Sequence, residues 1–201
     1  MIAEFSVWKP LGMVVPDAIL VLTPPSQSDG RSDVHDPEWQ AFAIKHHLAL
    51  VGCFFQDAVL SGIEKYADAG DSGYELVSFL DRSFNFKVPP ILLWGFSAGG
   101  QFNYEFAVMY PSWVAGFVVN KGGVYYTALA PKETRDIPAL WFIGERDAEW
   151  RRDIVRGIVN LNRVAGCQWE LVKELDTAHS IGVSKELSKT FFATILKNLK
   201  K

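Results

Sequence analysis

Short apolar runs rich in β-branched and aromatic residues alternate along this chain with segments whose apolar residues recur every three or four positions. The runs that we interpret as strands are Ala18 to Thr23, Leu48 to Phe54, Ile91 to Gly95, Val114 to Val119, Ala139 to Ile143 and Gln168 to Lys173. The first five are almost continuously apolar, which is typical of strands covered on both faces of a parallel sheet. This rhythm predicts an α/β fold with three layers, α/β/α, around a mostly parallel central sheet.

Helical spacing falls between and after these runs. Asp36 followed by Pro37 is the cap and first-position pair that begins many helices, and apolar residues continue from there at helical spacing. Four further helices are predicted from stripes that run from Tyr74 to Phe84, Phe102 to Met109, Ile154 to Leu161 and Leu187 to Leu199. No internal repeat, linker or low-complexity tract interrupts the pattern, so we expect one domain over residues 1–201.

Composition argues against several classes of partner. The chain has 20 basic and 23 acidic residues and a net charge of -3, which leaves no broad cationic face for nucleic acid or anionic lipid. Lys9, Pro10 and Asp17 interrupt the apolar stretches near the N-terminus, so neither a signal peptide nor a membrane span is predicted. A cytoplasmic location is the default expectation, and export is the alternative if a leader has been removed. Nothing in the sequence indicates the oligomeric state.

Cysteine and metal-binding patterns point to no cofactor. Cys53 and Cys167 lie far apart in apolar surroundings, which favours two buried free thiols over a disulfide framework. The sequence has no C-x₂-C, no H-E-x-x-H, no P-loop and no G-x-G-x-x-G in a βαβ context. We therefore predict no metal and no cofactor.

A G-x-S-x-G pattern stands between a predicted strand and a predicted helix. The residues are Gly95-Phe96-Ser97-Ala98-Gly99, and the helical stripe starts three positions later. In this context the pattern predicts a nucleophile elbow, a sharp turn that lifts the serine hydroxyl above the sheet, with both glycines placed where a Cβ would crowd the turn. Ser97 is then the candidate nucleophile, and the N–H of Ala98 is a candidate oxyanion donor. The alternative is a glycine-rich turn with an incidental serine.

A serine nucleophile needs a general base and a group that orients the base. His179 lies in a short polar loop between the last predicted strand and the last predicted helix, from which it could reach Ser97. We interpret the remaining histidines as solvated or packing residues: His35, His46 and His47. The acid is expected after a strand between serine and histidine. Asp147 is the preferred acid and Glu145 the fallback, and the alternative is that both only cap the helix that follows.

Three motifs, each at a strand end, resemble the α/β-hydrolase superfamily: GFSAGG after ILLW, GERD after LWFI, and a C-terminal TAHS. The overlap runs from about Ala18 to the end of the chain. The compact layout, the LTPPSQSDGR segment and the PEWQAFA helix further resemble the polyhydroxybutyrate depolymerase and feruloyl esterase type. The resemblance implies a minimal α/β-hydrolase fold without a lid, a triad of Ser97, Asp147 and His179, and a serine esterase that cleaves small-molecule carboxylic esters through an acyl-enzyme.

The chain departs from that family in two places. Many relatives carry His-Gly after the first core strand, whereas here Thr23-Pro24-Pro25 follows, and proline has no N–H to donate to an oxyanion. The second donor is therefore predicted at Ser26 or Gln27. Because only 17 residues precede Ala18, we also expect the N-terminal hairpin of the family to be reduced to one edge strand. Without an insertion large enough for a lid, the site should be open and shallow.

Loops after the other strands are expected to line the substrate pocket. The candidate substrate-binding residues are Gln27, Gln56, Lys121, Tyr125 and Trp150. Two other functions stay open at this point. One is a non-catalytic protein of the same fold that binds without turnover, which the Pro24-Pro25 pair favours. The other is a triad enzyme that acts on thioesters or peptides, or that transfers acyl groups.

Overall fold

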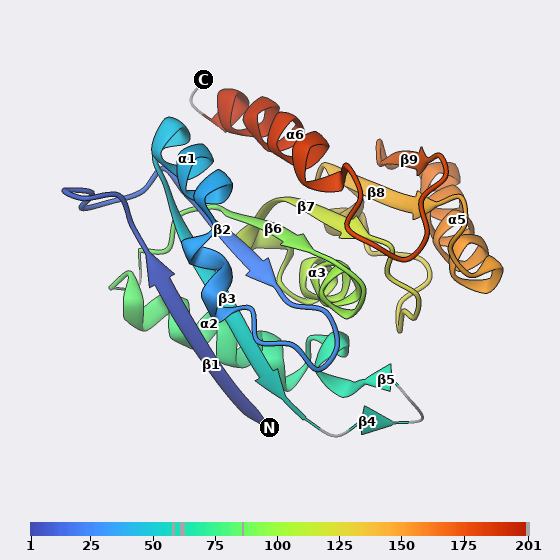
Figure 1. Ribbon diagram of the computed structural model, residues 1–201, viewed down its shortest axis with the longest axis horizontal. Coiled ribbons are helices and arrows are strands. Elements are labelled where there is room, and N and C mark those ends of the chain that lie inside the picture. Colours follow the sequence, from blue (N-terminus) through green and yellow to red (C-terminus); the bar gives the residue numbers. More distant parts are fainter. Residues whose placement is uncertain (58, 61–62, 86, 200–201) are drawn as a thin grey trace.

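The computed structural model describes residues 1–57, 59–60, 63–85 and 87–199 (Figure 1). Within these residues seven strands form one sheet: β1 (Ile2–Trp8), β2 (Ala18–Thr23), β3 (Leu48–Gln56), β6 (Ile91–Gly95), β7 (Val114–Asn120), β8 (Ala139–Gly144) and β9 (Glu170–Glu174). Their order across the sheet is β1-β3-β2-β6-β7-β8-β9. All neighbours pair in parallel except β1 and β3, which are antiparallel. A separate hairpin joins β4 (Val59–Leu60) to β5 (Ile63–Glu64).

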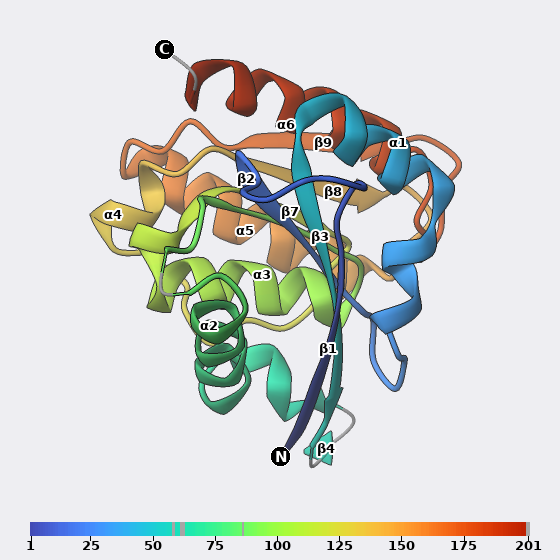
Figure 2. The same ribbon diagram turned by 90° about the vertical axis from the view of Figure 1, so that its left-hand side faces the viewer.

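Helices cover both faces of the sheet, as Figure 2 shows from the side. The α-helices are α1 (Pro37–His46), α2 (Asp71–Ser83), α3 (Ala98–Met109), α4 (Lys132–Arg135), α5 (Glu149–Val164) and α6 (Ser184–Leu199), and the short 3₁₀ helices are η1 (Arg31–His35), η2 (Lys65–Asp68) and η3 (Pro111–Trp113). Helices α1 and α6 lie on one face, and α2, α3 and α5 lie on the other. The predicted three-layer α/β/α architecture with a mostly parallel sheet is confirmed.

The apolar runs are nearly continuous because the side chains of one strand pack into two cores, one on each face of the sheet. In β2, Ile19 and Val21 join the core under α2, α3 and α5, whereas Leu20 and Leu22 join the core under α1 and α6. All four side chains are fully buried. Each buried side chain of this size contributes about 1.5–3 kcal/mol, so neither face of the strand tolerates a polar residue without loss.

The strand predictions hold at their starts for β2, β3, β6, β7 and β8, but the last strand begins two residues later than predicted. Sheet pairing starts at Glu170, opposite Leu140, whereas Trp169 just before it is buried and stacks on Trp141 at a ring separation of 5.4 Å. Its apolar side chain is therefore a core residue that precedes the strand, and composition alone does not separate the two roles.

Before β2 the described chain forms one strand, β1, at the edge of the sheet, as the sequence predicts. Strand β1 pairs with β3, and Phe5 packs on Phe79 of α2 at a ring separation of 4.5 Å. Cys53 and Cys167 are buried free thiols, as predicted, and burial raises the pKa of the Cys53 thiol far above its usual value. Over the part of the chain that the structure describes, we find no helix with both the length and the apolar character needed to cross a bilayer.

The start of α1 offers a test of the sequence-encoded cap. Asp36 Oδ1 accepts hydrogen bonds from the N–H groups of Glu38 and Trp39 at 2.9 and 3.0 Å, and its Oδ2 lies 2.8 Å from Lys185 Nζ of α6. One carboxylate therefore begins α1 and also joins it to α6.

We expect Asp36→Ala to lower the free energy of unfolding by about 1–2 kcal/mol, because it removes the cap and the ion pair together. Asp36→Asn keeps a side-chain oxygen for the cap and loses only the charge, so its cost should stay below about 1 kcal/mol. Urea denaturation of both variants measures the difference. Equal losses would show that the cap contributes nothing.

Candidate active site

The loops that follow β2 and β6 start side by side. Thr23 at the end of β2 pairs in register with Gly95 at the end of β6. From β2 the chain continues through α1 to β3 on one side, and from β6 it continues through α3 to β7 on the other. The direction of the crossovers thus reverses between these two strands, which is where open α/β sheets form their ligand sites.

Ser97 occupies a strained turn between β6 and α3. Its backbone has φ 56° and ψ -120°, a region that residues with a side chain rarely adopt. The turn is held by the Ser97 N–H, which donates to Asn120 O at 2.9 Å, and by the Gly99 N–H, which donates to Phe96 O at 3.0 Å. The strand, the turn and the helix that the sequence predicts around Ser97 are all present.

Two glycines are required by the close approach of backbone around this turn. A Cβ on Gly95 would lie 2.5 Å from the carbonyl carbon of Gly99, so this glycine is crowded by the turn itself, as expected. A Cβ on Gly99 would instead lie 2.3 Å from Thr23 O. The second glycine therefore lets the loop after β2 contact the first turn of α3, which is a correction to the expectation that both glycines relieve the turn alone.

The structure brings together the three side chains that the sequence singles out. His179 Nε2 lies 3.0 Å from Ser97 Oγ, and His179 Nδ1 lies 3.0 Å from Asp147 Oδ2. Asp147 follows β8, and His179 belongs to the connection from β9 to α6, which Figure 1 shows in red as it curves past the carboxyl ends of β7 and β8. The ring of Phe96 packs against the imidazole at 4.7 Å between centroids. A hydroxyl, an imidazole and a carboxylate thus form a continuous chain of polar contacts.

The Asp147 carboxylate is buried and fully engaged. Its side chain is 2% exposed, and its Oδ1 accepts from the Ala148 N–H at 2.7 Å and from Arg151 Nη1 at 2.5 Å. Burial raises the pKa of this carboxyl, but the hydrogen bonds from His179 and Ala148 and the nearby positive charges outweigh it and hold the pKa below its usual value. Asp147 is therefore anionic at neutral pH.

The fallback acid is placed elsewhere. Glu145 points to the surface, where its carboxylate contacts Lys173 Nζ at 2.5 Å and accepts from the Asp176 N–H at 3.1 Å. Of the two acids that the GERD motif offers, the structure places Asp147 against His179.

The loop after β2 is anchored at its start and exposed at its tip. Tyr66 Oη donates to Pro24 O at 2.9 Å, and Thr23 Oγ1 donates to Asn103 Oδ1 at 2.8 Å. Ser26 and Gln27 form an exposed turn in which Gln27 has a φ of 56°. Ala98 is the buried first residue of α3. A second oxyanion donor at Ser26 or Gln27 stays a prediction.

One predicted substrate-binding residue is wrong. Lys121 is fully buried, and its ammonium group pairs with Glu174, so it cannot contact a substrate. Its position after a predicted strand suggested a loop that lines the pocket, whereas the side chain is buried inside the protein. Sequence analysis also missed Arg151, although its spacing of four residues from Asp147 on a helix is a recognisable signal.

The other candidates for substrate binding differ in exposure. Gln56 is exposed at the end of β3, and Gln27 is exposed in its turn. Trp150 is 51% exposed, with the Arg151 guanidinium 4.6 Å above its ring. Tyr125 instead packs against Tyr104 and Trp141, and its hydroxyl oxygen is buried. Packing thus accounts for the Tyr125 ring, while the others stay candidates.

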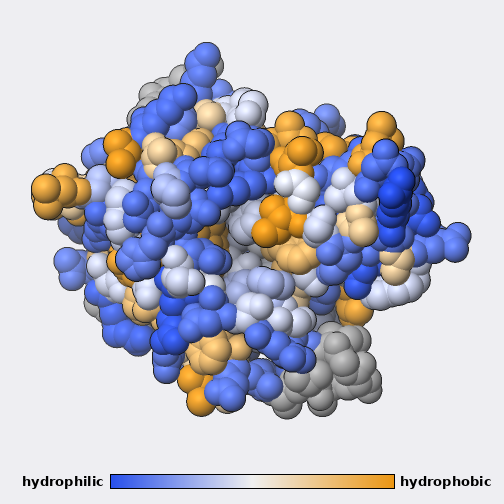
Figure 3. All heavy atoms as spheres, viewed as in Figure 1, coloured by the Kyte–Doolittle hydropathy of each residue, from blue (hydrophilic) through white to orange (hydrophobic). Residues whose placement is uncertain are grey.

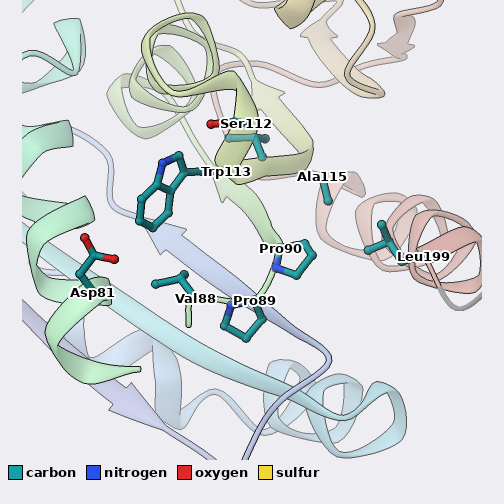
Figure 4. Close-up of a pocket in the computed structure, with 9 residues that line it drawn as sticks. Asp81, Val88, Pro89, Pro90, Ser112, Trp113, Ala115 and Leu199 are labelled. Atoms are coloured by element: carbon teal, nitrogen blue, oxygen red, sulfur yellow. The ribbon is translucent and has the colours of Figure 1, made fainter. Parts of the chain in front are cut away.

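A pocket of about 500 Å³ lies away from these side chains (Figure 4). It is lined by Asp81, Val88, Pro89, Pro90, Ser112, Trp113, Val114, Ala115 and Leu199. Pro90 directly precedes β6 and Trp113 directly precedes β7, so the pocket sits at the amino ends of the strands. Ser97 and His179 lie at the carboxyl ends, and the two places are separate.

The surface in the view of Figure 1 is mostly hydrophilic, with hydrophobic residues in scattered groups (Figure 3). One such group projects with the loop between β1 and β2, where Leu11, Val14 and Val15 are largely exposed. Among the described side chains, no group of three or more His, Cys, Asp or Glu is arranged to hold a metal ion.

The order of the strands and the similarity to solved structures show that this chain has the α/β-hydrolase fold. The structure of esterase PE8 is similar with a TM-score of 0.72 and 15% identity, covering 96% of this chain and 99% of that chain. Esterase 2 of Thermogutta terrifontis, phosphoramylated by tabun, is similar with a TM-score of 0.70 and 16% identity, covering 96% of this chain and 89% of that chain. A variant of SOBER1 from Arabidopsis thaliana is similar with a TM-score of 0.68 and 16% identity, covering 92% of this chain and 99% of that chain.

Neither protein-family models nor curated proteins match the sequence. The three structures above are not described as polyhydroxybutyrate depolymerases or feruloyl esterases, so that narrower resemblance stays a prediction.

The lowered pKa of Asp147 gives a prediction for acid stability. Because the folded-state pKa lies below the unfolded value of about 3.9, the unfolded chain takes up a proton first as the pH falls. The contribution of Asp147 to stability is therefore complete above the unfolded pKa and is lost as the pH falls through the folded pKa.

We expect wild-type protein to lose stability more steeply than Asp147→Asn as the pH falls from about 5 through the folded-state pKa of Asp147, measured by urea denaturation at several pH values. The two proteins should differ most near neutral pH and converge in acid. A constant difference over the whole range would contradict the lowered pKa.

Proposed function

We propose that this chain is a serine hydrolase that cleaves carboxylic esters of small molecules through an acyl-enzyme on Ser97. The observation that carries the proposal is the contact chain from Ser97 Oγ through the His179 ring to a buried, anionic Asp147, with 3.0 Å at each step. The strained backbone of Ser97 supports it, because strain of this kind persists where the surrounding structure imposes a function-related geometry.

The chemistry follows from the geometry. His179 Nε2 accepts the proton of Ser97 as Oγ attacks the ester carbonyl carbon, and Asp147 stabilises the imidazolium that forms. The N–H of Ala98 and a donor at Ser26 or Gln27 hold the negative oxygen of the tetrahedral intermediate. When the intermediate collapses, the alcohol leaves with the proton from His179, and water then attacks the acyl-enzyme by the same route.

Solved structures with the same fold support the ester assignment. Two of those reported above are described as esterases, and one of them as phosphoramylated by tabun, an organophosphorus reagent. An organophosphorus probe is therefore a direct test of the serine in this chain, and it needs no knowledge of the natural substrate.

We expect a fluorophosphonate probe to label wild-type protein at Ser97, located by mass spectrometry of the digest, and Ser97→Ala to abolish the label. Hydrolysis of a short-chain nitrophenyl ester should fall by about 10⁴-fold or more in Ser97→Ala and His179→Gln, because either change removes a group that acts as part of a unit. Ser112→Ala, at the exposed Ser112 beside the remote pocket, is the matched control and should keep the wild-type rate.

Other outcomes separate the remaining functions. Folded wild-type protein without a label on Ser97 would contradict the proposal and favour a binding protein of the same fold. A labelled protein that turns over thioesters or peptides faster than esters, or that transfers the acyl group to an added alcohol or amine, would keep the nucleophile and overturn the ester assignment.

A further inference from the structure

A buried ion pair lies beneath the loop that carries His179. Lys121, the residue after β7, contacts Glu174, the last residue of β9, and their side chains are 0% and 2% exposed. Neither residue belongs to the contact chain of Ser97, His179 and Asp147. A pair so deeply buried calls for a physical explanation. Removing two charges from water costs about as much free energy as their attraction returns, and a pair of apolar residues of the same size often stabilises the folded protein equally well.

The pair is bonded to the return arm of the His179 loop. Glu174 Oε1 accepts from the Val183 N–H at 2.7 Å. Lys121 Nζ also donates to Asn120 Oδ1 at 3.1 Å, and Asn120 Nδ2 in turn donates to Ser184 Oγ at 2.5 Å and to Ile181 O at 3.3 Å. Residues 181–184, which begin two positions after His179, are thus held by polar groups from the ends of β7 and β9.

The other arm of the loop is fixed by backbone contacts. The Arg146 N–H donates to Thr177 O at 2.9 Å, and Gly144 lies so close to the loop that a Cβ there would come within 2.6 Å of Ala178 O. His179 is therefore held on both sides. The backbone carbonyl oxygen of Asn120 also accepts the hydrogen bond from the Ser97 N–H. The network under the His179 loop and the turn of Ser97 meet at this one residue.

We propose that Glu174, with its charge balanced by Lys121, is a positioning residue that holds the His179 loop where the imidazole reaches Ser97. The inference rests on the proposed function, because it requires His179 to act as the base for Ser97. A carboxylate is suited to this task, since a charged acceptor binds a backbone N–H more strongly than a neutral one, and the lysine ammonium group lies against the carboxylate inside the protein. Displacement of a base by about 1 Å costs on the order of 10²-fold in rate.

Two matched double variants test the role without leaving a single buried charge. Both variants carry Lys121→Met, and they add either Glu174→Gln or Glu174→Met. Each replaces the ion pair by neutral side chains of similar length, but only glutamine keeps an oxygen for the Val183 N–H. The readout is the rate constant for fluorophosphonate labelling of Ser97, measured at a temperature where thermal unfolding shows each variant to be folded. We expect the glutamine variant to stay within about threefold of wild type and the methionine variant to be about 10- to 100-fold slower.

A third variant reaches the same contact from the exposed side. A Cβ on Gly182 would lie only 2.2 Å from Glu174 Oε1, so Gly182→Ala must push the carboxylate away from the Val183 N–H or move the loop. Gly182 is exposed but has a φ of 58°, where alanine is strained, so thermal unfolding must show that the variant is folded at the temperature of the assay. We expect its labelling to slow to a similar degree. Leu80→Ala is the control, since it opens a cavity under α2 and lowers stability without touching the loop, and it should label at the wild-type rate.

The low-field proton resonance of the His179 to Asp147 contact provides an independent readout, which should weaken in the slow variants and persist in the glutamine variant and in Leu80→Ala. Equal labelling rates for the two double variants, or a wild-type rate for Gly182→Ala, would overturn the positioning role while leaving the proposed function intact. A wild-type protein that does not react at Ser97 would contradict the proposed function itself, and the inference with it.

Discussion

The parallel register of the central strands is the constraint on which the rest of this molecule depends. Thr23 pairs with Gly95, Phe96 forms an isolated parallel bridge to Asn120, and Asn120 pairs with Phe142. Strands that end level with one another deliver the loops that follow to a single edge of the sheet. Residues separated by tens of positions in the chain become neighbours there without any long excursion of the backbone.

Much of this arrangement could be predicted from the sequence, because a buried parallel strand is almost continuously apolar and polar residues just after it must lie at the sheet edge. Each of Ser97, Asp147 and His179 follows a predicted strand, and they occur along the chain in the order serine, acid and histidine. The register of Trp169 could not be predicted, since a buried residue before a strand has the same apolar character as one within it. Lys121 was misjudged because its partner Glu174 lies 53 positions away, and only the folded backbone brings the two together.

Two buried carboxylates with different partners lie close to His179 in the structure: Asp147 contacts its ring, and Glu174 contacts its loop. Asp147 is shared between the His179 ring and Arg151, and its backbone partner is the N–H of the next residue. Glu174 is balanced by Lys121 and bonded to the Val183 N–H. In each case one oxygen meets a cation and the carboxylate also accepts a backbone N–H, so each charge is compensated while it fixes a segment of chain. The first carboxylate contacts the His179 ring, and the second contacts the loop that carries this ring.

Trp150 stands apart from this rigid framework. It lies at the start of α5, half exposed, with Arg151 stacked on its ring, and it is held by a helix turn rather than by the end of a strand. A substitution at such a position changes the shape and polarity of the surface beside Arg151 while the pairing of the strands stays the same. Related sequences can therefore diverge at this surface without any change in the register of the central sheet.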